Sequence, residues 1–142
     1  MKRKRSTRAK SPLKTLTARL DREFSRYVRL RDSDENGTGK CCTCGKLLYW
    51  KDAHACHFVS RRHMATRWDE RNVHLGCPRC NTFLDGALDE YSAFIIDRYG
   101  KDTFDELLRL KRTTKNWLHD ELKSMADDYA KRAKTLESNL TN

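Results

Sequence analysis

The sequence predicts an α+β fold that is mostly helical, with a small metal-stapled core flanked by N-terminal and C-terminal helices. Three observations lead to this prediction. Only 37% of the 142 residues are hydrophobic. So short and polar a chain builds a thin core that commonly needs further stabilisation by a disulfide, a bound metal or a partner subunit. Two C-x-x-C pairs in the middle of the chain offer metal ligands. Apolar residues recur at helical spacing on both sides of these pairs.

The chain begins with a basic arm, residues 1–14, in which most residues are Lys, Arg, Ser or Thr. Residues 1–31 contain 12 basic and 2 acidic residues, whereas residues 32–142 contain 18 of each, so the whole net charge of +10 lies at this end. We expect the arm to be disordered when free and to bind a polyanion, with DNA the first candidate. A solubilising tail is the alternative. The predicted DNA-binding residues of the arm are Lys2, Arg3, Lys4 and Arg5.

The spacing of apolar residues places the next elements. Residues 15–31 have apolar side chains near every 3.6 positions, which predicts a helix. An acidic, glycine-containing segment at 32–39 ends it. Short β segments are expected at 47–50 and 57–59, inside an irregular region rich in cysteine and histidine.

Three amphipathic helices are expected after Gly86, over about 88–99, 102–112 and from 114 onward. The apolar side chains of the last helix are most simply core residues. Their 4-3-4 spacing also suits pairing between helices in a homodimer. These residues are Trp117, Leu118, Leu122, Met125 and Tyr129.

Cys41, Cys44, Cys77 and Cys80 form the two C-x-x-C pairs. No apolar segment follows the basic N-terminus, so we expect no secretory signal and a reducing compartment, where metal binding is favoured over disulfides. Four thiolates suit a closed, structural Zn²⁺ site. Two redox motifs are the alternative. The 32 residues between the pairs exceed the common zinc-ribbon spacing of ~15–20. This length indicates that the loop between the pairs contains a further element besides the metal-binding turns.

The loop and its surroundings resemble the HNH, or ββα-metal (His-Me finger), nucleases and, more narrowly, the phage NinG (Rap) recombination proteins. The segments that carry the resemblance are Tyr27–Asp32, Cys41–Lys46, His57–Arg61, Asp69–His74 and Cys77–Asn81. The resemblance implies a zinc-stapled ββα-metal nuclease domain over residues 15–100. The remaining residues, 101–142, are expected to form a C-terminal helical extension. The resemblance also implies a metal-dependent DNA endonuclease acting on branched recombination intermediates such as Holliday junctions or D-loops.

Residue roles follow from this resemblance and from chemistry. His57 can accept a proton near neutral pH, and it matches the general base of the family. Asn72 is expected to tie the loop and orient His57. His74 lies in a matching motif, where a role near the phosphate and a role in the core are both open. Asn81 offers a carbonyl oxygen, which suits a catalytic Mg²⁺ or Mn²⁺.

One position departs from the pattern of many HNH nucleases, which have Asp immediately before the base. Here that position is Cys56. NinG-like proteins resemble a variant without this Asp, and Mg²⁺ keeps several of its waters. Asp52 and His54 are possible substitute ligands, and Asp85 is a weaker one.

Arg61, Arg62 and Arg67 lie inside the same loop, where guanidinium groups suit phosphate binding. The expected partner is therefore DNA and not a membrane, because no apolar run approaches the ~18–20 residues of a span. The expected location is the cytoplasm, that of the bacterial host if the chain is phage-encoded. A non-catalytic, zinc-stapled DNA-binding recombination accessory protein is the alternative function.

Deleting residues 1–10 removes six of the 12 basic residues in the first 31. We expect weaker DNA binding and a shallower dependence of affinity on salt, because each phosphate contact contributes ~0.9 to the slope of log K against log salt. Affinity measured against salt for the full and shortened chains tests this. Coincident lines would show that the arm does not contact DNA.

Overall fold

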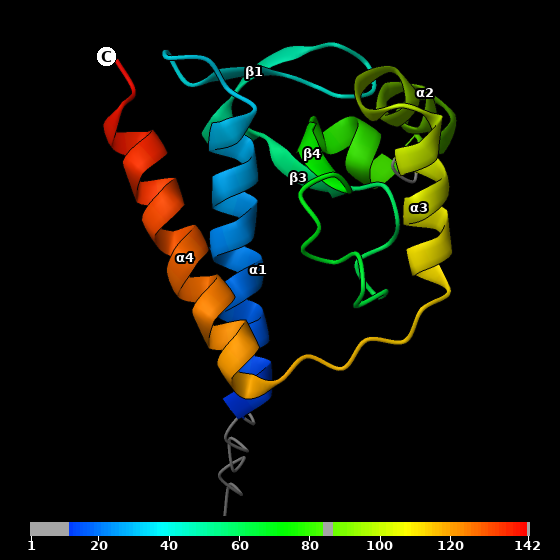
Figure 1. Ribbon diagram of the computed structural model, residues 1–142. Helices are drawn as coiled ribbons and strands as arrows, with labels where there is room; N and C mark the ends of the chain where they lie inside the picture. The colour runs from blue at the N-terminus through cyan, green and yellow to red at the C-terminus, as the bar shows by residue number, and fades with distance from the viewer. Residues whose placement is uncertain (1–11, 84–86, 142) are drawn as a thin grey trace, which may run out of the picture.

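The computed structural model describes residues 12–83 and 87–141 and is shown in Figure 1. Two long helices, α1 (Pro12–Arg31) and α4 (His119–Ser138), lie side by side on one flank of the molecule. Two shorter helices, α2 (Leu88–Tyr99) and α3 (Lys101–Lys111), form the opposite flank. The strands and the long loop between β3 and β4 lie between these flanks (Figure 1). Lys2, Arg3, Lys4 and Arg5 lie outside the described residues.

Packing of α4 along α1 builds the larger hydrophobic core. The buried residues of α4 recur with 4-3-4 spacing, which places them on one helix face. Phe24 of α1 meets Tyr129 of α4 edge to face, with ring centroids 4.8 Å apart. Of the residues that the sequence offered for dimerisation, Leu122, Met125 and Tyr129 pack in this core within the chain, whereas Leu118 is exposed. The buried residues of the two helices are Leu20, Phe24, Tyr27, Val28, Leu30, Leu122, Ala126, Tyr129 and Ala133.

The strands form two separate antiparallel pairs. In the first pair, β1 (Thr38–Lys40) lies against β2 (Leu47–Tyr49). In the second, β3 (His54–His57) lies against β4 (Val73–Gly76), with His57 opposite Val73. A 3-10 turn, η1 (Trp50–Asp52), connects the two pairs, and a π-helical turn, η2 (Arg79–Phe83), follows β4. The order β3–β4–η2 is thus strand, strand, helical turn.

The expected β segment at 57–59 is confirmed only at His57, where β3 ends. The buried side chain of Asn72 occupies both backbone groups of Val59, accepting from its N–H at 2.7 Å and donating to its carbonyl at 3.0 Å. The backbone of Val59 is therefore bonded to a side chain and not to a neighbouring strand. The segment at 47–50 is confirmed except at Trp50, which begins the 3-10 turn.

The helices at 88–99 and 102–112 are confirmed within a residue or two, but the last helix begins at His119 and not near 114. The indole N–H of Trp117 donates to the carbonyl of Met64 at 2.9 Å. The same ring meets Trp68 edge to face, with centroids 5.9 Å apart. These contacts hold residues 112–118 as a link across the β3–β4 loop.

Among the described residues, no helix has both the length and the apolar character needed to cross a membrane.

The α1–α4 core predicts different costs for two leucines four residues apart. Leu122 is 3% exposed and Leu118 is 67% exposed. Leu122→Ala is expected to lower the free energy of unfolding by ~2–5 kcal/mol, whereas Leu118→Ala is expected to change it by less than ~0.5 kcal/mol. Urea unfolding of the two variants measures both values. Equal losses would contradict the packing of α4 on α1.

Candidate functional site

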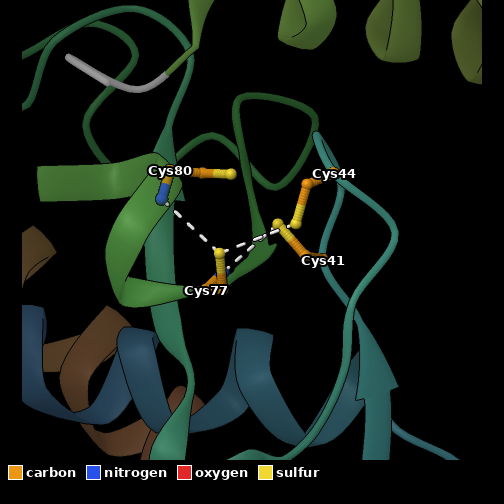
Figure 2. Close-up of side chains that lie close together, drawn as sticks. All are labelled: Cys41, Cys44, Cys77 and Cys80. Carbon is orange, nitrogen blue, oxygen red and sulfur yellow. Dashed lines mark hydrogen bonds between the residues drawn. The ribbon is translucent and has the colours of Figure 1, made fainter. Parts of the chain in front are cut away.

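The four cysteines of the two C-x-x-C pairs converge on one point (Figure 2). Cys41 and Cys44 come from the turn between β1 and β2, and Cys77 and Cys80 come from the turn after β4. All four sulfur atoms lie within 4.8 Å of one another. The Sγ atoms of Cys44 and Cys77 are 3.7 Å apart, close to the ~3.8 Å edge of a tetrahedron with Zn–S bonds of ~2.3 Å. This arrangement can hold a zinc ion.

Backbone geometry shapes both turns around the sulfurs. Gly45 has φ +77°, and its N–H donates to the carbonyl of Cys41 at 3.0 Å, a left-handed turn that glycine adopts at low cost. The N–H groups of Cys77 and Cys80 donate to the sulfurs of Cys41 and Cys77 at 3.2 and 3.5 Å. Such bonds stabilise thiolates over thiols. Cys42 and Cys56 lie outside the cluster.

A cavity of about 830 Å³ lies between the β3–β4 loop and the helices α1, α2 and α3. His57 and Asn81 both line it. Arg61, Arg62 and His63 line it from the loop. The structure thus brings the predicted base and the predicted oxygen ligand, 24 positions apart in the chain, into one cavity.

His57 is held by its Nε2 atom, which lies 2.9 Å from the carbonyl oxygen of Arg67. A carbonyl oxygen only accepts hydrogen bonds, so Nε2 carries the proton and Nδ1 keeps a free lone pair. Burial lowers the pKa of His57 below its ordinary value, so the ring is neutral at neutral pH. Arg67 is fixed in turn by Asp21 of α1, with its Nε 3.0 Å from the Asp21 Oδ1. His57 is therefore an oriented proton acceptor.

Asn81 is positioned by the cysteine turn. Its backbone N–H donates to the carbonyl of Cys77 at 3.1 Å. Its side-chain nitrogen lies 3.1 Å from Nδ1 of His54, and an amide nitrogen can only donate. This bond occupies His54 and leaves the Oδ1 of Asn81 available to a ligand.

Asn72 and His74 lie outside this cavity. Asn72 is fully buried and also donates to the carbonyl of Thr66 at 3.1 Å, so it ties together the β3–β4 loop, which contains Arg67, the partner of His57. His74 is 1% exposed, and its ring nitrogens lie 3.0 and 2.7 Å from the hydroxyls of Tyr91 and Tyr99. Burial, with a smaller contribution from Arg31, lowers the pKa of His74 to about 3. Of its two possible roles, the geometry favours the core.

The arginines of the loop divide into two kinds. Arg67 is paired with Asp21, whereas Arg61 and Arg62 are exposed and, within residues 12–83 and 87–141, belong to no ion pair. Sequence reasoning missed Lys111, which lines the cavity from the last turn of α3. The only local signal for it was a basic residue at the end of an amphipathic helix. Three cations at one cavity favour an anionic ligand.

No second cluster of three or more His, Cys, Asp or Glu ligands forms in the described part of the chain. Asp52 is exposed in the η1 turn and does not line the cavity, and Asp85 lies outside the described residues. Cys56 is buried on β3 between Ala55 and His57, which both line the cavity. Because side chains alternate along a strand, Cys56 faces the other way.

A protein-family model described as "Bacteriophage Lambda NinG protein" matches residues 1–139. The protein ninG of Salmonella phage P22 is 30% identical over 112 residues, which cover 78% of this chain and 52% of that protein. The ninG proteins of Escherichia phages lambda and 933W are each 28% identical over 114 residues, covering 79% of this chain and 52% and 53% of those proteins. The chain therefore spans about half the length of these relatives. No solved structure matches it.

The exposed position of Cys44 allows a test of zinc binding that does not disturb buried packing. Cys44→Ser is expected to reduce bound zinc from about one ion per chain to near zero and to lower thermal stability, because a structural metal contributes directly to folding. Cys80→Ser is expected to do the same. Cys42→Ser, beside the cluster, is the matched control and should keep its zinc. Metal analysis and thermal unfolding measure both effects, and a normally folded, zinc-free Cys44→Ser protein would refute the structural role.

Proposed function

Since this chain belongs to the bacteriophage lambda NinG family, we propose that it is a metal-dependent DNA endonuclease that acts on branched recombination intermediates such as Holliday junctions or D-loops. The observation that carries the proposal is the shared cavity of His57 and Asn81. A protein that only binds DNA needs neither an oriented neutral histidine nor a free amide oxygen beside unpaired cations. Hydrolysis of a phosphodiester needs an activated water and positive charge at the phosphate, and these groups can supply the base, a metal ligand and the cations.

His57 is the general base in this proposal. Its Nδ1 takes a proton from a water molecule, and the water oxygen attacks the phosphorus. The P–O bond to the leaving deoxyribose oxygen breaks, and that oxygen takes a proton from solvent. The hydrogen bond from Nε2 to the Arg67 carbonyl holds the ring in the tautomer that this step requires and stabilises the imidazolium that forms.

Arg61, Arg62 and Lys111 are proposed to hold the phosphates of the DNA strand, because cations without carboxylate partners are free to bind anions. Arg67 is not included among them, since Asp21 already occupies its guanidinium group. The Oδ1 of Asn81 suits Mg²⁺ or Mn²⁺ as a hard ligand, with waters and DNA phosphates completing the coordination. Such an ion would supply charge neutralisation at the cleaved phosphate.

The zinc that the four cysteines can bind has a structural role in this proposal. Cys77 and Cys80 belong to the turn that sets the backbone of Asn81, so a zinc ion bound there would place the metal-binding oxygen relative to β3. The succession of β3, β4 and η2 supports a ββα-metal arrangement of this site. Thiolates thus serve the structural ion, and oxygens serve the catalytic one.

His57→Ala is expected to retain zinc and DNA binding while cleavage falls by ~10²–10⁴-fold, the range for losing one acid–base group. Asn81→Ala is also expected to lose cleavage, with partial recovery at high Mg²⁺ if the amide only binds metal. His119→Ala, at an exposed histidine of α4, is the matched control and should cleave like the parent. Single-turnover nicking of four-way DNA across a Mg²⁺ series, with zinc measured alongside, tests all three variants.

Cleavage near the parent rate by zinc-replete His57→Ala would assign the base elsewhere. Failure of the parent to cut any duplex, single-stranded, flap or four-way DNA would favour the non-catalytic DNA-binding accessory protein instead.

A further inference from the structure

The cavity that contains His57 and the loop arginines is also lined by residues that the proposed hydrolysis does not use. We call these residues the second wall of the cavity. This wall is apolar and comes from Leu88 of α2 and from Phe104 and Leu108 of α3. Leu88 is 52% exposed and Leu108 is 37% exposed. Phe104 packs on Phe58, with ring centroids 5.6 Å apart. Phosphate chemistry gives no reason to expose apolar side chains beside a cluster of cations.

Three residues of α3 that line the cavity form a stripe along one face of the helix. Phe104, Leu108 and Lys111 lie at positions i, i+4 and i+7 and share one face of the helix. The neighbouring Leu107 is fully buried in the core, so the helix anchors itself through one face and presents the stripe to the cavity through another. Along this face, the apolar side chains of Phe104 and Leu108 are therefore followed by the cation of Lys111. All three line the same cavity as His57.

A nucleotide has matching parts, because a flat apolar base is joined through its sugar to a phosphate. Proteins that hold single strands combine a basic track for the backbone with aromatic and apolar side chains against the bases. The volume of about 830 Å³ lies within the ~300–1,000 Å³ of typical ligand sites. A paired base is stacked inside the duplex and cannot reach such a wall without being extruded.

We propose that Phe104 and Leu108 form a subsite for one unpaired base of the DNA strand, with Lys111 on the adjoining phosphate. This inference rests on the proposed function for the identity of the ligand as DNA. The subsite would select DNA in which a base next to the cleaved phosphate has no partner, as at a branch point or a bulge. Selection would thus come from an apolar wall and not from contacts that identify a particular base.

The test is a binding experiment with the full chain and no added Mg²⁺, so that no cleavage is needed. The probes are two DNA duplexes of the same sequence context, one with a single bulged 2-aminopurine and one with that base paired. The parent is expected to bind the bulged probe about tenfold more tightly, within the range of one base contact. Fluorescence of the bulged 2-aminopurine is expected to change on binding.

Leu108→Glu places a negative charge in the subsite at a partly exposed position and is expected to abolish this preference. Leu118→Glu makes the same change at an exposed leucine that does not line the cavity, and it should keep the preference. Phe104→Leu preserves an apolar side chain but removes the ring, and it is expected to give an intermediate preference. Thermal unfolding of each variant checks that it is folded.

A parent that binds both probes equally would overturn the subsite, and so would a folded Leu108→Glu protein that keeps the preference. Either result leaves the nuclease proposal intact if the parent cuts the bulged probe when Mg²⁺ is added. A preference that Leu108→Glu abolishes, in a parent that cuts nothing, supports the subsite and refutes the nuclease. The two proposals therefore fail separately.

Discussion

The convergence of four cysteine sulfurs is the constraint on which the rest of the structure depends. It joins the turn between β1 and β2 to the turn after β4, two segments more than 30 positions apart. The second turn runs directly into Asn81, whose backbone bonds to Cys77. Strands of three or four residues have few ladder hydrogen bonds of their own, and short sheets are marginal in isolation. A bound metal would make this small region rigid enough to position a site.

Helix α1 provides the second support, because it holds the loop between β3 and β4 by polar contacts. Asp21 binds Arg67, whose carbonyl oxygen accepts a hydrogen bond from the Nε2–H of His57. Farther along α1, the hydroxyl of Tyr27 donates to Glu70 of the same loop at 2.7 Å. Tyr129 of α4 donates to the same carboxylate at 3.2 Å. The long helices thus do more than enclose a core, since they determine where the loop that carries Arg61 and Arg62 lies.

The cavity combines groups that have different physical requirements. His57 needs partial burial, which keeps it neutral, and a fixed tautomer, which one backbone carbonyl provides. The cations need solvent and freedom from carboxylates, and Arg61 and Arg62 are exposed. The apolar wall of α3 needs an anchor behind it, which Leu107 supplies. A site between the loop and two flanks of helices meets all three requirements at once.

The sequence by itself determined the features that neighbouring residues encode. Helical periodicity located α1, α2 and α3, and the C-x-x-C spacing identified the four cysteines that can hold a metal ion, because both patterns are local. Tertiary contacts decided the rest. Asn72 ended β3 by bonding Val59, 13 positions away, and Trp117 delayed α4 by bonding Met64, 53 positions away. His74 became a core residue only because Tyr91 and Tyr99 cover it. No local pattern contains such partners, and none could bring Phe104, Leu108 and Lys111 of α3 to the same cavity as His57.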